Sequence, residues 1–196
     1  MAANTARFSG PHHADQIRRF AEALRGQYAL AVRDKTMNEE TAREFLRHTL
    51  ATVAYRAEKA INNAPGEFAG FKASETTRTP LQILAHMGDL FDWALSMAKG
   101  KTVWNDAPPR SWEAESARFF AAVKTFDDYL ASDNEVEKPL EKLFQGPVAD
   151  ALTHVGQINL LRRMFDSPVR GENYFRAEIE IGRVGAEQSA NRTEFD

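Results

Sequence analysis

The stretch PVADALTHVGQINLLRRMF, residues 147–165, decides how the rest of the chain is interpreted. Pro147 favours a first helical position, where its missing N–H would be unpaired in any case. Asp150 falls in the first turn, and Arg162 and Arg163 fall in the last, so their charges match the two ends of a helix dipole. The stretch is therefore predicted to form one helix.

A carboxylate and an imidazole share one side of this predicted helix. Asp150 and His154 are four residues apart, so both project from the same side, which Gln157 and Leu161 continue. Apolar residues flank that side, which predicts that it points inward. Burying these groups is costly unless each has a partner. A metal ion and a plain hydrogen bond between the two side chains are both open as that partner.

Composition indicates an ordinary globular chain. Of its 196 residues 43% are hydrophobic and 27% are charged, which is enough for one domain with its own core. The formal net charge of −3 gives no electrostatic argument for nucleic acid or an anionic membrane as a partner. The absence of cysteine excludes disulfides, zinc–thiolate sites and a cysteine nucleophile. No apolar run reaches the roughly 18 residues that span a bilayer, so we expect a cytoplasmic protein.

Hydrophobic periodicity and capping signals predict four more helices. The spacing of Thr36 and Glu39 is that of a capping box, and Asn38 is an alternative cap. On the helix that follows, Phe45 and Leu46 are among the residues predicted to point inward. Thr79 and Ser111 are predicted caps of later helices. The predicted helices are residues 13–33, 37–63, 80–99 and 112–131.

The predicted fold is therefore all-α, in one domain over residues 1–196. A four-helix bundle (core about 37–166) would contain residues 37–63, 80–99, 112–131 and 147–165, with the helix over residues 13–33 in front of it. The connections are long enough for two successive helices to run parallel, so loop length does not choose the topology. In the tail, residues 167–196, apolar and charged residues alternate from Phe175 to Ile181, which predicts an extended segment lying on the bundle.

The second bundle helix adds His86, with Gln82, Asp89, Leu90 and Trp93 on the same side. Together with the pair on the fourth helix, it makes a set of two imidazoles and one carboxylate. Such a set suits Zn(II), Ni(II), Fe(II) or Mn(II), and three protein ligands leave positions open for water or substrate. The alternative is that His154 is a core histidine with a hydrogen bond to Asp150 one turn away, and that His86 takes no part.

Two segments carry a resemblance to a known family. Residues 79–87, TPLQILAHM, and 150–158, DALTHVGQI, resemble the signature helices of the DinB/YfiT-like superfamily. This resemblance implies a bundle with an up-down-down-up path and a divalent metal inside. The family pattern has a histidine on the second helix and H-x-x-x-H followed by G-Q-I on the fourth. His86 and His154 match it, and Asp150 replaces the first histidine of the pair, so metal identity stays open.

The resemblance also implies a function. Some members are thiol transferases that use a low-molecular-weight thiol, and others are described as hydrolases. Both follow from an open divalent site, which lowers the pKa of a bound water or thiol. A second hypothesis is a non-catalytic, stress-related or ligand-binding bundle whose metal is structural or absent. A small-molecule substrate is the expected partner, and a homodimer is expected from the pairing of family members.

Other residues each have two interpretations. Gln157 orients His154, faces a bound ligand, or is only a polar residue on the surface of the helix. Asp89 orients or replaces a ligand, or is solvated. Trp93 lines a cavity or packs in the core. Arg162 clamps an anionic substrate or complements the helix dipole, and His48 approaches the same cavity or is simply exposed. No residue stands out as a general base.

Overall fold

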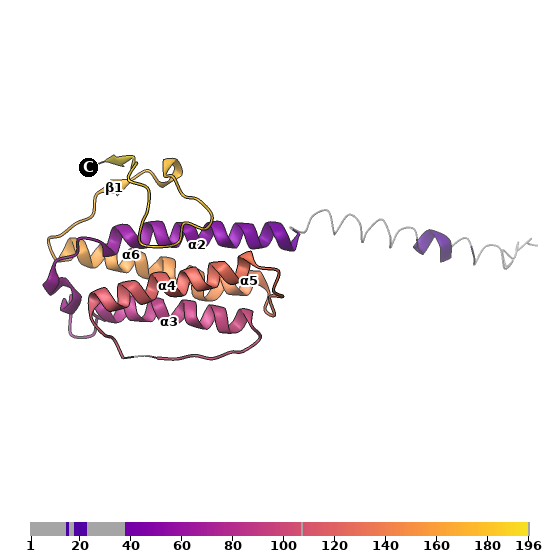
Figure 1. Ribbon diagram of the computed structural model, residues 1–196, viewed down its shortest axis with the longest axis horizontal. Coiled ribbons are helices and arrows are strands. Elements are labelled where there is room, and N and C mark those ends of the chain that lie inside the picture. The colour runs from indigo at the N-terminus through magenta and orange to yellow at the C-terminus, as the bar shows by residue number, and fades with distance from the viewer. Residues whose placement is uncertain (1–14, 16–17, 23–37, 107, 196) are drawn as a thin grey trace, which may run out of the picture. The chain divides into compact units, whose positions relative to one another are not determined.

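The computed structural model (Figure 1) describes residues 15, 18–22, 38–106 and 108–195. Contacts divide the chain into two compact units, Met1–Glu39 and Glu40–Asp196. In the first unit, Asp15 and residues 18–22 are helical, within the helix predicted over residues 13–33. The rest of that predicted helix and the predicted cap Thr36 lie outside the described residues.

The second unit is mostly helical, as the sequence predicts. Thr79 and Gln82 form a reciprocal capping box at the start of the second long helix, and Pro80 lies between them in its first turn. The Ser111 side chain accepts a hydrogen bond from the Ala114 N–H at the next helix start. The long helices are α2 (Glu39–Ile61), α3 (Pro80–Ala98), α4 (Trp112–Ala131) and α6 (Ala149–Met164), and a 3₁₀ turn, η1 (Gly66–Gly70), separates the first two.

The helix that carries Asp150 and His154 begins earlier than predicted. A short α5 (Leu140–Leu143) continues through a π-helical segment, η2 (Phe144–Val148), directly into α6, and Pro147 lies inside that segment. The prediction that Pro147 starts the helix is therefore wrong. A π turn skips one ordinary hydrogen-bond register, so it can accommodate a residue that has no N–H to donate. Asp150 follows this irregular turn by two residues.

The apolar faces of the four long helices form one core. Fully buried members come from every one of them and include Leu50, Leu84, Phe126 and Ile158. Phe45, predicted to point inward, is 59% exposed, so that prediction is wrong. Leu46, the next residue and also predicted to point inward, is 2% exposed, so that prediction is confirmed.

α3 and α4 run in the same direction. Figure 1 shows the connection after α3 returning along the length of the helices before α4 begins. The two helices pack closely along each other. A long connection was necessary for this path, because a short loop would have made the two helices antiparallel neighbours.

Arg162 holds the ends of α6 and α2 together. Its guanidinium donates to the backbone carbonyls of Ala60, Asn62 and Asn63 at the end of α2, and its Nε donates to Ser167 O. The residue is 5% exposed, and burial lowers its pKa. Arg162 therefore caps a neighbouring helix, which satisfies carbonyls that the helix itself leaves unpaired.

The tail contacts α2, but it is not extended throughout, contrary to the prediction from the sequence. Phe175 belongs to a 3₁₀ turn, η3 (Tyr174–Arg176), and is 98% exposed, so the prediction of an extended segment is wrong at this point. A short β1 (Gly171–Glu172) pairs antiparallel with β2 (Glu194–Phe195). Glu172 is buried and accepts hydrogen bonds from Tyr55 and Lys59 of α2. These buried polar contacts fix the tail, where side-chain alternation alone could not.

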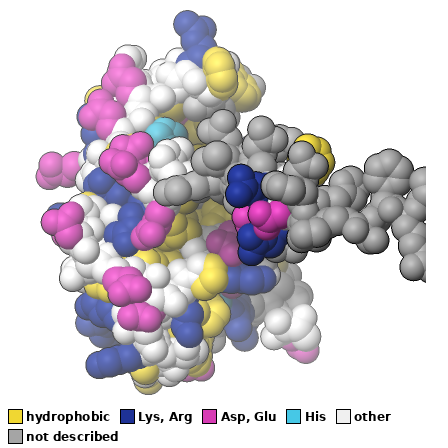
Figure 2. All heavy atoms as spheres, turned by 90° about the vertical axis from the view of Figure 1, so that its right-hand side faces the viewer, with side chains coloured by type: hydrophobic (Ala, Val, Ile, Leu, Met, Phe, Trp, Pro, Cys, Tyr) yellow, Lys and Arg dark blue, Asp and Glu magenta, His cyan; other side chains and the backbone are white. Residues whose placement is uncertain are grey.

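The described surface gives two further findings. Among the described helices, none combines the length and apolar character that crossing a membrane requires. On the face in Figure 2, basic and acidic side chains are interspersed rather than separated by sign.

Replacing Arg162 by Met should lower the free energy of unfolding by about 2 kcal/mol. The change keeps most of the side-chain volume but leaves the four carbonyls without their charged donor. Arg163→Met is the matched control, because Arg163 is exposed on the same helix and should change stability by less than about 0.5 kcal/mol. Urea unfolding of both variants checks this, and equal stabilities would contradict the capping role.

Candidate metal centre

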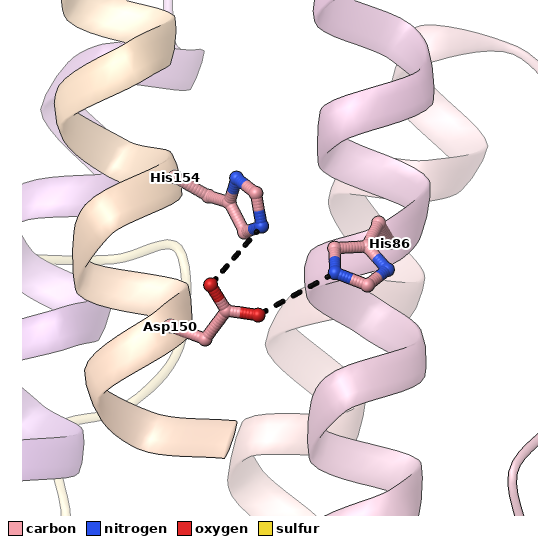
Figure 3. Close-up of side chains that lie close together, drawn as sticks. All are labelled: His86, Asp150 and His154. Atoms are coloured by element: carbon pink, nitrogen blue, oxygen red, sulfur yellow. Dashed lines mark ion pairs between the residues drawn. The ribbon is translucent and has the colours of Figure 1, made fainter. Parts of the chain in front are cut away.

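Two helices bring three side chains of metal-ligating types together (Figure 3). His86 lies in the second turn of α3, and Asp150 and His154 lie on successive turns of α6. Asp150 Oδ1 is 3.4 Å from His154 Nε2, and its Oδ2 is 3.6 Å from His86 Nε2. One donor atom of each residue lies within 4.8 Å of the other two. The group could therefore hold a metal ion.

The separations of the donor atoms bear on both interpretations of the group. Separations of 3.4 and 3.6 Å are longer than usual for N–H···O bonds, which measure about 2.7–3.2 Å. Ligand atoms placed tetrahedrally at about 2.1 Å from an ion lie about 3.4 Å from one another. The Asp150 separations are thus compatible with a shared ion, which would draw the donor atoms closer than the 4.8 Å within which all three lie. Two imidazoles and one carboxylate suit a divalent transition metal.

The three side chains differ in exposure. Side-chain exposure is 10% for His154, 18% for His86 and 48% for Asp150. The prediction that all three point inward is therefore wrong for Asp150, which keeps contact with solvent and so avoids much of the cost of burying its charge. The half-exposed carboxylate leaves this side of the group accessible to small molecules.

Gln157 orients His154. Its Oε1 lies 2.8 Å from His154 Nδ1. An amide oxygen only accepts, so Nδ1 is the donor of this pair, and in a neutral ring the lone pair is then on Nε2, the nitrogen near Asp150. Histidines that bind metals commonly have their second nitrogen held in this way. The geometry favours an orienting role for Gln157 over that of a polar residue that only contacts solvent.

Electrostatics keep His86 in the form that binds metals. Burial lowers the pKa of His86 below its ordinary 6.5, nearby His154 and Arg78 lower it further, and Asp150 partly opposes the shift. The His86 imidazole is therefore neutral at pH 7, as metal ligation requires.

Asp89 serves a different purpose. It is 3% exposed, so the solvated interpretation is wrong. Its carboxylate accepts a 2.8 Å hydrogen bond from Arg118 of α4, which also donates to Glu115 and to the Ala85 carbonyl. Asp89 is not a member of the group with His86. It neutralises a partly buried guanidinium that ties α4 to α3 beside the histidine.

Trp104 is a site residue that sequence reasoning missed. It lies in the connection between α3 and α4, and its ring packs edge-on against His86, with centroids 5.5 Å apart. Trp93, predicted to line a cavity or to pack in the core, contacts Trp104 at 5.7 Å. A tryptophan within a proline-rich connection was the signal that could have found it, because so large a ring gains much by packing on a surface.

A cavity of about 410 Å³ adjoins His86. Arg78 and Gln82 line it from the α3 side, and Asp106 and Pro109 line it from the connection. Its size suits a small molecule, and its lining offers both charges. Because His86 belongs to both the cavity and the three-residue group, a molecule in the cavity would lie next to the candidate metal position.

Two other candidates lie away from this group. His48 is exposed on α2, and Arg162 donates to backbone carbonyls.

Comparison of the chain with family models, with curated proteins and with solved structures finds no match in any of the three.

The purified chain should bind about one divalent ion, and His86→Ala, Asp150→Ala and His154→Ala should each abolish most of that binding. His48→Ala is the matched control and should retain the ion. Because an imidazole must be neutral to bind, affinity should fall at acidic pH, and the lowered pKa of His86 places the protonation of that residue below pH 6.5. Elemental analysis and competition titration measure both effects, and metal content unchanged by all three substitutions would refute the ligand set.

Gln157→Met should weaken metal binding about 10–100-fold while the ion remains bound at high concentration. The variant keeps the side-chain size but removes the acceptor for His154 Nδ1. Thr153→Val, one residue before His154 on an exposed position of α6, provides a control with no such contact. Titration with a metal-competing dye gives the affinities, and equal values for both variants would exclude an orienting role.

Proposed function

We propose that this chain is a divalent-metal protein that activates a water molecule or a small thiol for a hydrolase or thiol-transferase reaction. The observation that carries the proposal is the convergence of two imidazoles and one half-exposed carboxylate on donor positions within 4.8 Å of one another. A divalent ion held by such donors lowers the pKa of a water molecule or thiol, which supplies a nucleophile near neutral pH. The absence of cysteine means that thiol chemistry would need an external thiol.

Different residues around the candidate site would have different roles in this reaction. The ion would be held by His86, Asp150 and His154. Gln157 would keep the proton of His154 on Nδ1, so that Nε2 is left to bind the ion. Trp104 packs edge-on against one side of His86. The adjoining cavity would take the substrate, and Arg78 at its wall would attract a negatively charged part of that substrate.

The proposal includes membership of the DinB/YfiT-like superfamily and its up-down-down-up four-helix bundle. Its support is the shared core of α2, α3, α4 and α6 and the parallel path of α3 and α4. The segments with family-like sequence are the two that meet at the candidate site. The replacement of one histidine by Asp150 adds negative charge, which favours a harder divalent ion than a three-histidine site would.

Reconstitution with Zn, Ni, Fe or Mn should produce activity in one of two assays: conjugation of a small thiol to an aryl halide, or hydrolysis of a nitrophenyl ester. We expect rates at least about 100-fold above those of the chelated protein, since metal stabilisation of developing charge contributes several kcal/mol. His86→Ala should lose this activity and His48→Ala should keep it.

The same assays separate the two function classes. Metal binding without activity on any probe, with all four metals, would favour the ligand-binding bundle with a structural metal. Activity that survives both chelation and His86→Ala would refute the proposal, because it would arise elsewhere on the chain.

A further inference from the structure

A second pocket of about 410 Å³ lies between the outer side of α6 and the tail. Its lining includes Arg56, Leu160, Arg163, Arg170, Tyr174 and Phe195. None of the three candidate metal ligands is among the lining residues. The pocket is therefore a separate site, and what it binds does not depend on the proposed metal chemistry.

The pocket has an excess of positive charge. Three arginines line it against one carboxylate, that of Glu172, whose two oxygens accept hydrogen bonds from Tyr55 and Lys59. Glu172 therefore has little capacity left to neutralise the arginines. Arg170 pairs with Glu194 at 3.7 Å. Within the described part of the chain, neither Arg56 nor Arg163 has an ion-pair partner.

Arg56 has a buried polar atom without a partner. Its Nε is shielded from solvent and donates no hydrogen bond to any described residue, while its guanidinium lies over the Tyr174 ring at 4.4 Å. Stacking on an aromatic face fixes the plane of a guanidinium. Leaving a buried donor unpaired costs free energy, so such atoms call for an explanation. An acceptor supplied by a ligand in the pocket would explain this one.

Apolar side chains stand beside the arginines. Leu160 is 58% exposed and Phe195 is 55% exposed, although both are large and hydrophobic. Both side chains line the pocket, so an apolar group bound there could cover part of their exposed surface. The pocket thus combines fixed cationic donors with uncovered apolar surface.

We propose that this pocket binds a small organic oxyanion, a carboxylate or phosphate group attached to an apolar body. The planar donors of Arg56 and Arg163 match two oxygens of such a group. Leu160 and Phe195 would contact its apolar body.

Isothermal titration with benzoate, phenyl phosphate, inorganic phosphate and benzyl alcohol tests the proposal on the full chain. At least one aromatic anion should bind saturably, about tenfold or more tightly than inorganic phosphate, and the neutral alcohol should not bind. Arg56→Gln and Arg163→Gln should each weaken that binding at least about tenfold, as loss of a charged hydrogen bond predicts. Arg163 is exposed, so its variant stays informative even where Arg56→Gln fails to fold.

Two control variants locate the binding. Arg176→Gln removes an exposed tail arginine that does not line the pocket and should bind like the parent chain. Asp150→Ala disrupts the candidate metal centre and should also bind like the parent. No saturable binding of either aromatic anion, or affinities within twofold of the parent for both Arg56→Gln and Arg163→Gln, would overturn the proposal. Loss of binding in Asp150→Ala would place the anion at the metal centre and overturn it equally.

Discussion

The packing of α3 alongside α6 is the interaction on which the candidate site depends. Asp150 and His154 share a face of α6 through helix geometry alone, but their distance to His86 depends on how the two helices lie against each other. A rotation or a shift by one residue of either helix would move His86 out of reach. The π-helical segment η2 ends two residues before Asp150 and itself contacts α3.

Buried charges hold the surrounding elements in place. Arg118 joins α4 to α3 next to His86, Arg162 joins α6 to the end of α2, and Glu172 joins the tail to α2. In each of the three, the buried charge has hydrogen-bond partners, which is the condition under which burial is tolerated. Arg56 departs from that rule, and this contrast is what distinguishes its pocket from the structural networks.

Local signals in the sequence predicted local structure well. The capping box at Thr79 and the cap at Ser111 mark helix starts that the structure confirms, because a cap acts over only a few residues. The same kind of reasoning failed at Pro147, where residues before the proline extend the helix, and at Phe175, where a 3₁₀ turn interrupts the segment that alternation predicted to be extended. In both places distant contacts outweigh a local preference.

The sequence by itself determined the helical class of the chain, the starts of α3 and α4, and the common face of Asp150 and His154. All of these depend on residues within one or two turns of each other, whose geometry the backbone fixes. Only the tertiary structure decided that Trp104 covers His86, that Arg118 takes Asp89 as its partner, and that Asp150 lies at the exposed rim. Those outcomes depend on which helix faces pack against each other. The packing of all core residues together determines this, and no single segment does.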